Sequence, residues 1–116
     1  RIFKHQMGYT CLFQDHHCIP KEHRNHELLK TLDYNINNYD NIMIMPNKKG
    51  MIELNLNPNT LVHDGGHLKY NIYVKKQLNY IYKNYHDHES YRYQFWLLQK
   101  HLKKNMYYNQ DNIPWR

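Results

Sequence analysis

The sequence predicts a small α+β domain in which short strands come before two long helices. Residues 9–15 and 42–45 are rich in aromatic and aliphatic side chains, which favours strands. Over 63–85 and 91–102, histidine and apolar side chains recur every three or four residues, as they do on one face of a helix. With 116 residues, 41% of them hydrophobic, the chain fits a single domain over 1–116 with a modest core.

The first predicted strand, 9–15, leads directly to the adjacent histidines His16 and His17. Successive side chains of a strand point to opposite faces. One imidazole is therefore free to bind a metal ion while the other acts on water.

A short amphipathic helix is expected over 21–32, because Pro20 favours a helix start and apolar and charged residues fall on opposite sides. Two histidines in this segment, His23 and His26, are expected to be exposed to solvent. The apolar side of the helix consists of Leu28, Leu29 and Leu32.

The second strand, 42–45, is expected to form a hairpin with a third strand across a turn at 46–50. In the third strand, Ile52, Leu54 and Leu56 alternate with polar residues. Such alternation is typical of a hairpin with one solvated face.

The strongest periodic signal predicts a helix that begins near His63. Thr60 or Asp64 is suited to cap it, and Gly65 and Gly66 remove side-chain bulk, which allows a ligand or backbone to approach. A last helix, capped by Ser90, is expected to cover the core, and residues 105–116 are expected to be irregular. The two stripes are His63, His67, Tyr70, Val74, Leu78, Ile81 and Tyr85, followed by Tyr91, Phe95, Leu98 and Leu102.

The charge of the chain favours a polyanionic substrate such as nucleic acid. Its net charge is +6, and the excess lies in residues 59–116, with nine Lys and Arg against four Asp and Glu. No apolar run approaches the roughly 20 residues that span a bilayer, so we expect a soluble domain without membrane contact. Because the chain begins at Arg1 and not at Met, we expect it to be the end part of a larger protein.

The two cysteines, Cys11 and Cys18, lack the CxxC spacing of a zinc knuckle and do not indicate a disulfide framework. Cys11 is expected to pack in the core. Cys18 lies next to the histidine pair, where a thiolate can serve as a zinc ligand.

Histidines at the predicted start of the long helix are the candidate partners of the His16–His17 pair. His63 and His67 lie four residues apart, a spacing that puts both on one helix face and lets them bind one ion. Between the two clusters, Asn41 opens the predicted strand 42–45.

This order of motifs resembles the HNH nucleases, also called ββα-metal or His-Me finger nucleases. The stretches HHCIPKEHRNHELL, NIMIMPN and HDGGHLKYNIYV are most similar to the AHH-type branch, which occurs as toxin domains of bacterial polymorphic toxins. The resemblance covers residues 10 to 80 and implies a ββα-metal core of short antiparallel strands and a metal-binding helix, with added helices.

The resemblance also implies a role for each matching residue. His17 is the general base, Asn41 braces the loop that orients it, and the metal ligands are His16, His63 and His67. Asp15 stands where the AHH motif has alanine, so it is a candidate partner of the ligands or a competing ligand.

The activity implied is metal-dependent hydrolysis of DNA by an antibacterial toxin domain. An imidazole can take a proton from water near neutral pH, and a bound cation stabilises the charge that develops on the phosphate. A histidine shell favours Zn²⁺ or Ni²⁺ over Mg²⁺. The candidate phosphate contacts are Lys21, Lys69 and Lys76.

The toxin resemblance implies an immunity protein as partner, with an acidic surface that suits this basic domain, and delivery into the cytoplasm of a target cell. Three other readings stay open from the residues. The first is a ribonuclease with the same site, and the second a zinc-stabilised module that binds nucleic acid without cleaving it. A metallopeptidase is less favoured, because the sequence HDGGH lacks the glutamate of HExxH.

Overall fold

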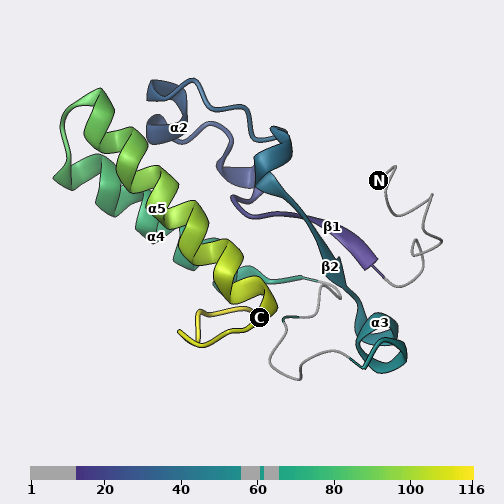
Figure 1. The fold of residues 1–116 in the computed structure, drawn as a ribbon. Coiled ribbons are helices and arrows are strands. Elements are labelled where there is room, and N and C mark those ends of the chain that lie inside the picture. The colour runs from purple at the N-terminus through teal and green to yellow at the C-terminus, as the bar shows by residue number, and fades with distance from the viewer. Residues whose placement is uncertain (1–12, 56–60, 62–65) are drawn as a thin grey trace.

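The computed structural model describes residues 13–55, 61 and 66–116 and arranges them as a two-stranded sheet beside a helical hairpin (Figure 1). The predicted α+β class is confirmed. In chain order the elements are β1 (Phe13–His17), η1 (Lys21–His23), α2 (Glu27–Thr31), η2 (Tyr39–Asn41), β2 (Ile42–Pro46), α3 (Lys48–Glu53), α4 (Leu68–Asn84) and α5 (His88–Tyr107).

The sheet consists of β1 and β2, which pair antiparallel. In this register His16 lies opposite Met43, and His17 lies opposite Ile42. The strand predicted at 42–45 is therefore confirmed, and β1 carries both histidines at its C-terminal end.

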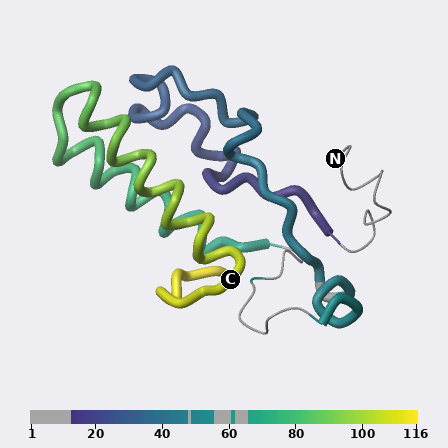
Figure 2. Tube along the Cα trace, in the orientation of Figure 1, coloured from purple at the N-terminus to yellow at the C-terminus, as the bar shows by residue number. Residues whose placement is uncertain are grey.

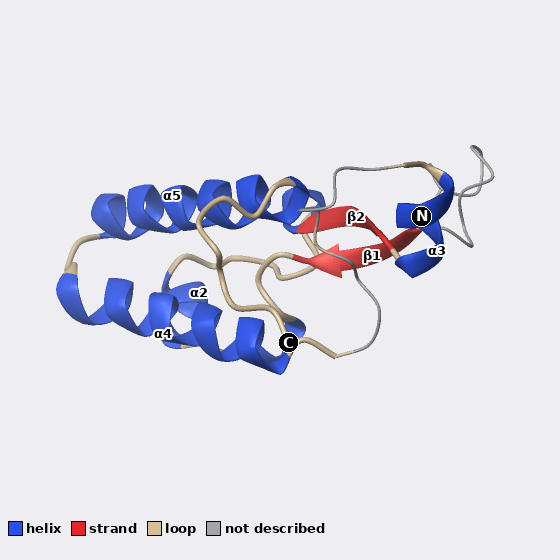
Figure 3. Ribbon diagram, turned by 90° about the horizontal axis from the view of Figure 1, so that it is seen from below, coloured by secondary structure: helices blue, strands red, loops and turns tan. Residues whose placement is uncertain are grey.

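The helices α4 and α5 form an antiparallel hairpin, with the sheet near one end of it (Figure 3). Both predicted stripes are buried within these helices: Tyr70, Val74, Leu78 and Ile81, and Tyr91, Phe95, Leu98 and Leu102. The cap of α5 differs from the prediction. Asp87 is the N-cap, and its carboxylate accepts hydrogen bonds from the amide and the hydroxyl of Ser90, both at 2.9 Å.

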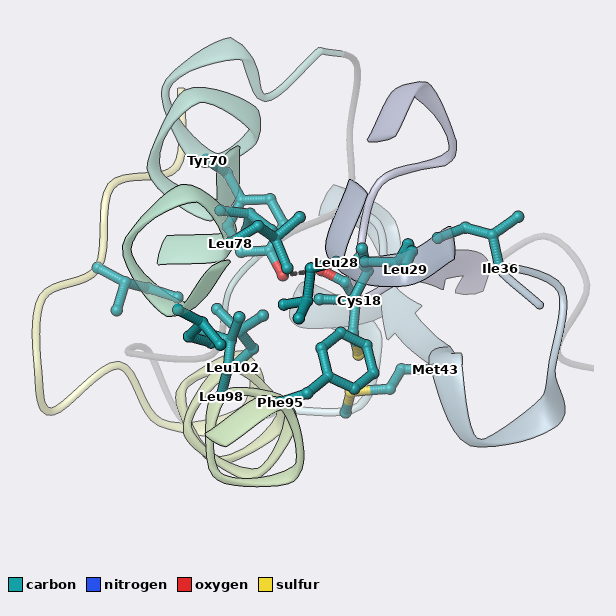
Figure 4. Close-up of a cluster of buried hydrophobic side chains, with 14 of the residues drawn as sticks. Cys18, Leu28, Leu29, Ile36, Met43, Tyr70, Leu78, Phe95, Leu98 and Leu102 are labelled. Atoms are coloured by element: carbon teal, nitrogen blue, oxygen red, sulfur yellow. Dashed lines mark hydrogen bonds between the residues drawn. The ribbon is translucent and has the colours of Figure 1, made fainter. Parts of the chain in front are cut away.

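The core lies between the hairpin, the short helix α2 and the chain segment that follows β1 (Figure 4). The hydroxyl of Tyr70 donates a hydrogen bond to the carbonyl of Cys18 in its centre. This bond ties α4 to the chain directly after the two histidines. The main buried side chains are Cys18, Ile19, Leu28, Leu29, Met45, Tyr70, Val74, Leu78, Phe95 and Leu102.

The predicted third strand is wrong, because residues 48–53 form the helix α3. The side chain of Asn47, after β2 ends at Pro46, accepts a hydrogen bond from the amide of Gly50 at 2.8 Å and caps this helix. The alternating pattern predicted that the side chain of Ile52 faces the core, but this side chain is 77% exposed. A capping asparagine thus outweighed a short alternating pattern.

The single helix predicted over 21–32 is divided into η1 and α2. His26 has an extended backbone, and its Nδ1 accepts a hydrogen bond from the amide of Leu28 at 3.0 Å, so it caps a new helix. The expected exposure of His23 is also wrong. Its side chain is buried, and Nε2 donates to the carbonyl of Asn71 at 2.8 Å.

The C-terminal segment returns to the beginning of α4 (Figure 2). The amide of Tyr70 donates to the carbonyl of Trp115 at 3.1 Å, and the Arg116 guanidinium donates to the carbonyl of Gly66 at 3.1 Å. Within the described ranges, no helix is long and apolar enough to cross a membrane.

Candidate active site

The two adjacent histidines point in different directions because they follow each other on β1. The side chain of His16 is 1% exposed and packs inside, whereas His17 is partly exposed. Both line a pocket of about 410 Å³ at the end of β1. Its lining residues are Asp15, His16, His17, Pro20, Lys21, Glu22, His67 and Asn71.

His16 and His67 form a pair of imidazoles inside this pocket. Their ring centres are 5.3 Å apart, and the ring planes are nearly perpendicular, at 85°. Two imidazoles that bind one ion at about 2.0–2.1 Å have ring centres roughly 5 Å apart. The pair therefore fits a shared divalent metal ion of the kind that prefers nitrogen ligands.

Aromatic rings surround the imidazole pair. The ring of Tyr70 lies 5.4 Å from that of His16, and the ring of Trp115 lies 5.4 Å from His16 and 4.8 Å from His67. Rings at this spacing restrict rotation of both imidazoles and keep water from one side of them. The helix α5 extends to Tyr107, so the segment predicted to be irregular over 105–116 is shorter than expected. Its Trp115 packs against both imidazoles.

A hydrogen-bonded chain fixes the orientation of His67. Its Nδ1 donates to the side-chain oxygen of Asn71 at 2.9 Å, and the amide nitrogen of Asn71 donates to the carboxylate of Glu22 at 2.5 Å. With the proton on Nδ1, the lone pair of His67 is on Nε2. Metal-binding histidines are commonly oriented by such partners on the other ring nitrogen.

His17 is held by a different asparagine. Its Nε2 donates to Oδ1 of Asn37 at 3.1 Å. This bond places the ring proton on Nε2 and the lone pair on Nδ1, the nitrogen that can accept a proton. Asp15, two residues earlier on β1, lies on the same face of the strand and lines the same pocket.

Asn41 is fully buried and connects two segments of backbone. Its Oδ1 accepts from the amide of Ile19 at 2.8 Å, and its Nδ2 donates to the carbonyls of Ile19 at 3.1 Å and Ile36 at 2.9 Å. Its own carbonyl accepts from the amide of Cys18 at 2.8 Å. These bonds fix the chain after His17 and the chain before Asn37 at once.

The predicted helical HxxxH arrangement is not present at His67. The helix α4 begins at Leu68, with His67 at the N-cap position, so His67 precedes the helix. His63, Thr60 and Asp64 lie outside the described residues, as does Cys11. Among the described residues no group of three His, Cys, Asp or Glu side chains surrounds one point. No backbone in the described part of the chain approaches Gly66, where an added Cβ would meet no protein atom within 4 Å.

Only one of the three candidate lysines lies at the pocket. Lys21 lines it, on η1. Lys69 and Lys76 line a separate hollow of about 250 Å³ on α4, with Ile72, Tyr73 and Pro114. The structure therefore does not place these two lysines beside the histidines.

Cys18 is a core residue. Its side chain is fully buried, and burial raises the pKa of the thiol to about 12. The structure therefore gives Cys18 a packing role in the core.

Four residues of the site were not found from the sequence: Glu22, Asn37, Asn71 and Trp115. Asn71 carried the clearest signal, because it lies four residues after His67, a spacing that brings side chains together at the start of a helix. Asn37 and Trp115 approach the histidines from distant segments, and Glu22 reaches His67 only through Asn71. Nothing in the local sequence marks them.

Comparison with known proteins gives one match. A family model described as a nuclease family of the HNH/ENDO VII superfamily with conserved AHH matches residues 3–102. No curated protein and no solved structure matches significantly. The matched span includes both histidine clusters and Asn41, whereas Trp115 lies beyond it.

Proposed function

Because this chain belongs to the AHH nuclease family of the HNH/ENDO VII superfamily, we propose that it hydrolyses DNA, with His17 as general base. The family makes it an endonuclease that acts on nucleic acid. The observation that best supports this proposal is the pocket at the end of β1. In it the partly exposed His17 lies beside an imidazole pair of which His16 is buried and His67 is partly exposed.

His17 suits the role of base because its ring is oriented and reaches open space. Asn37 takes the proton on Nε2, so Nδ1 accepts a proton from water as the water attacks phosphorus. Proton removal by a positioned side chain is a common contribution to such reactions. After the P–O bond breaks, the proton on His17 returns to solvent.

Asn41 acts by holding geometry. An uncharged amide is no base, but its hydrogen bonds to Ile19 and Ile36 fix the segments that flank His17 and Asn37. The base and its partner therefore keep a constant relative position. Lys21, in the same pocket, is the proposed contact for a phosphate of the substrate.

His16 and His67 are the proposed metal ligands, and His63, outside the described residues, is the proposed third. Nucleases of this superfamily generally use a divalent metal ion, which would stabilise charge on the phosphate and the departing oxygen. The imidazole donors favour Zn²⁺ or Ni²⁺.

Plasmid nicking with and without a chelator tests this function. We expect the protein to convert supercoiled plasmid to open-circular and linear forms, to stop when the metal is removed, and to resume when Zn²⁺ or Ni²⁺ is added back. Parallel digestion of total RNA separates the alternative, a ribonuclease. Nicking that continues in chelator would contradict metal dependence, and binding without cleavage of either polymer would favour the non-catalytic zinc module.

Replacement of Asn71 by alanine should weaken Zn²⁺ binding by about 10- to 100-fold, the usual effect of losing a partner of a metal ligand. The reason is that His67 would lose the bond that directs its lone pair. Isothermal titration of metal-free protein with Zn²⁺ measures the change.

Asn79→Ala is the matched control for that titration. Asn79 lies further along α4, and its Oδ1 accepts from Nε2 of His26 at 2.7 Å, so this variant also removes an asparagine–histidine bond. It should bind Zn²⁺ as the parent does. Equal affinities for all three proteins would mean that Asn71 does not orient a ligand.

The resemblance to AHH-type toxin domains is the basis for a proposed role as an antibacterial toxin. The proposed partner is an immunity protein whose acidic surface matches the net charge of +6. Its binding would cover the pocket or the basic surface and so block access of nucleic acid.

A further inference from the structure

A second pocket adjoins His17, and neither imidazole of the His16–His67 pair lines it. Its volume is about 360 Å³, within the range of about 300–1,000 Å³ that is usual for small-ligand sites. It shares Asp15, His17 and Lys21 with the pocket described above, so the two hollows meet at the proposed base. Its lining residues are Asp15, His17, Lys21, Asn37, Tyr39 and Ile42.

Among the large hydrophobic side chains that the structure describes, Tyr39 is the most exposed, at 89%. A single exposed aromatic residue on a protein surface needs no explanation. Tyr39 differs from such a residue because it lines the same pocket as His17. An aromatic face there can contact whatever is bound next to the reacting phosphate.

The backbone of Tyr39 is firmly held although its ring is exposed. Its carbonyl accepts from the amide of Ile42, the residue that lies opposite His17 in the sheet. Asn41, two residues later, is fixed by its buried hydrogen bonds. These contacts hold the backbone that carries the ring at a fixed position relative to His17.

The residue after Tyr39 is tied to α5. Asp40 accepts a hydrogen bond from the hydroxyl of Tyr34 at 2.6 Å, and that hydroxyl accepts from the side-chain amide of Gln99 at 2.8 Å. Burial and the neighbouring Asp40 raise the pKa of Tyr34 well above its usual range, so its hydroxyl keeps the proton that it donates. Asp40 and Asn41, the two residues that follow Tyr39, are therefore anchored.

We propose that Tyr39 and Ile42 form a nucleobase subsite, in which the base next to the cleaved phosphate stacks on the ring of Tyr39. Lys21 lines both pockets and binds the scissile phosphate, to which that nucleotide is joined. Every nucleobase has a π-face, so such stacking tolerates any sequence. This inference rests on the proposed function, because it takes His17 as the position of the reaction.

The subsite has a consequence for the form of substrate. A base in an intact duplex is already stacked on its neighbours, and removing it costs a few kcal/mol. A base in a single strand is available without that cost. The subsite therefore favours single-stranded or locally opened DNA over intact duplex.

The test is binding of an eight-nucleotide single-stranded DNA, measured by fluorescence anisotropy in a His17→Ala background that prevents cleavage. Tyr39→Ala should weaken binding by a factor of about 5 to 150, the usual effect of removing an aromatic side chain that stacks on a base. Tyr39→Phe should bind as the parent does, because it keeps the ring. Tyr80→Ala, which removes another exposed tyrosine from α4, is the matched control and should bind normally.

An oligonucleotide of the same length that contains only abasic nucleotides separates stacking from a change in structure. Tyr39→Ala and the parent should bind it equally, because it has no bases to stack. Equal binding of the normal oligonucleotide by Tyr39→Ala and the parent would overturn the subsite. An equal loss of affinity by Tyr39→Ala for both oligonucleotides would overturn it as well.

Failure of the proposed function gives a different result. In that case protein with intact His17 would leave plasmid, single-stranded DNA and RNA uncleaved, whatever the anisotropy data show. If the function holds and the subsite fails, cleavage is normal and Tyr39→Ala loses no affinity. With both correct, Tyr39→Ala should also lose the preference for single-stranded over duplex DNA in cleavage assays.

Discussion

Replacement of His17 by alanine should lower the rate of plasmid nicking by a factor of about 100 to 10,000, which is the usual effect of losing a general base. Its affinity for DNA should stay within a few-fold of the parent. Metal content should be unchanged, because β1 directs His16, and not His17, toward His67. Nicking rate, anisotropy with labelled DNA and elemental analysis on one preparation measure the three quantities.

His26→Ala is the matched control for His17. Both histidines donate from Nε2 to the side-chain oxygen of an asparagine, His17 to Asn37 and His26 to Asn79. Of these two histidines, only His17 lines the pocket at the end of β1. His26→Ala should lose some stability, since His26 also caps α2, but it should nick plasmid at the parental rate.

Two outcomes would change the assignment of His17. Nicking at the parental rate would mean that His17 is a strand-end histidine with a structural role. Loss of metal together with activity would mean that His17 binds the ion and that the roles of His16 and His17 are exchanged. As a test of the toxin role, the parent should arrest growth when expressed in a bacterial cytoplasm, and His17→Ala should not.

Replacement of Asn41 by alanine should remove most of the activity and destabilise the fold. Three buried backbone groups, on Ile19 and Ile36, would lose their hydrogen-bond partner. Each such loss costs about 1–3 kcal/mol, so the free energy of unfolding should fall by at least about 3 kcal/mol. A shift of the base by about 1 Å can lower the rate by about 100-fold.

A variant of similar stability separates the two effects of Asn41→Ala. Ile81→Ala creates a cavity near the far end of α4, where Ile81 is buried, and such changes cost about 2–5 kcal/mol. Urea unfolding gives the stability of each protein, and nicking is compared at a temperature where both are folded. Ile81→Ala should retain activity, whereas full activity of folded Asn41→Ala would mean that Asn41 is not the brace.

The sequence alone predicted much of the scaffold. The stripes of α4 and α5 were recognised because each helix buries one face against the core, and burial of one face imposes a period of 3.6 residues. The second strand, 42–45, was recognised because it is rich in aliphatic side chains, which favour strands. The order of the His16–His17 pair, Asn41, His63 and His67 indicated the family, since these motifs depend on local sequence.

The errors occurred where a local hydrogen bond decided the structure. Asn47 capped α3 where alternating residues predicted a strand, and His26 capped α2 in the middle of a predicted helix. In both cases a polar side chain satisfied a free backbone amide, which stabilises a helix start by about 1 kcal/mol. The stabilisation expected from a short apolar pattern does not outweigh the stabilisation by the cap.

The surroundings of the histidines were decided only by the tertiary structure. Asn37 and Trp115 reach His17 and the imidazole pair from segments whose sequence does not mark them. Burial of His23 likewise depends on the carbonyl of Asn71, 48 residues away. The sequence by itself thus determined the family and supplied the candidate reactive side chains. The packing of distant segments determined their orientation, because an imidazole ring is fixed by whichever partner the fold brings to its second nitrogen.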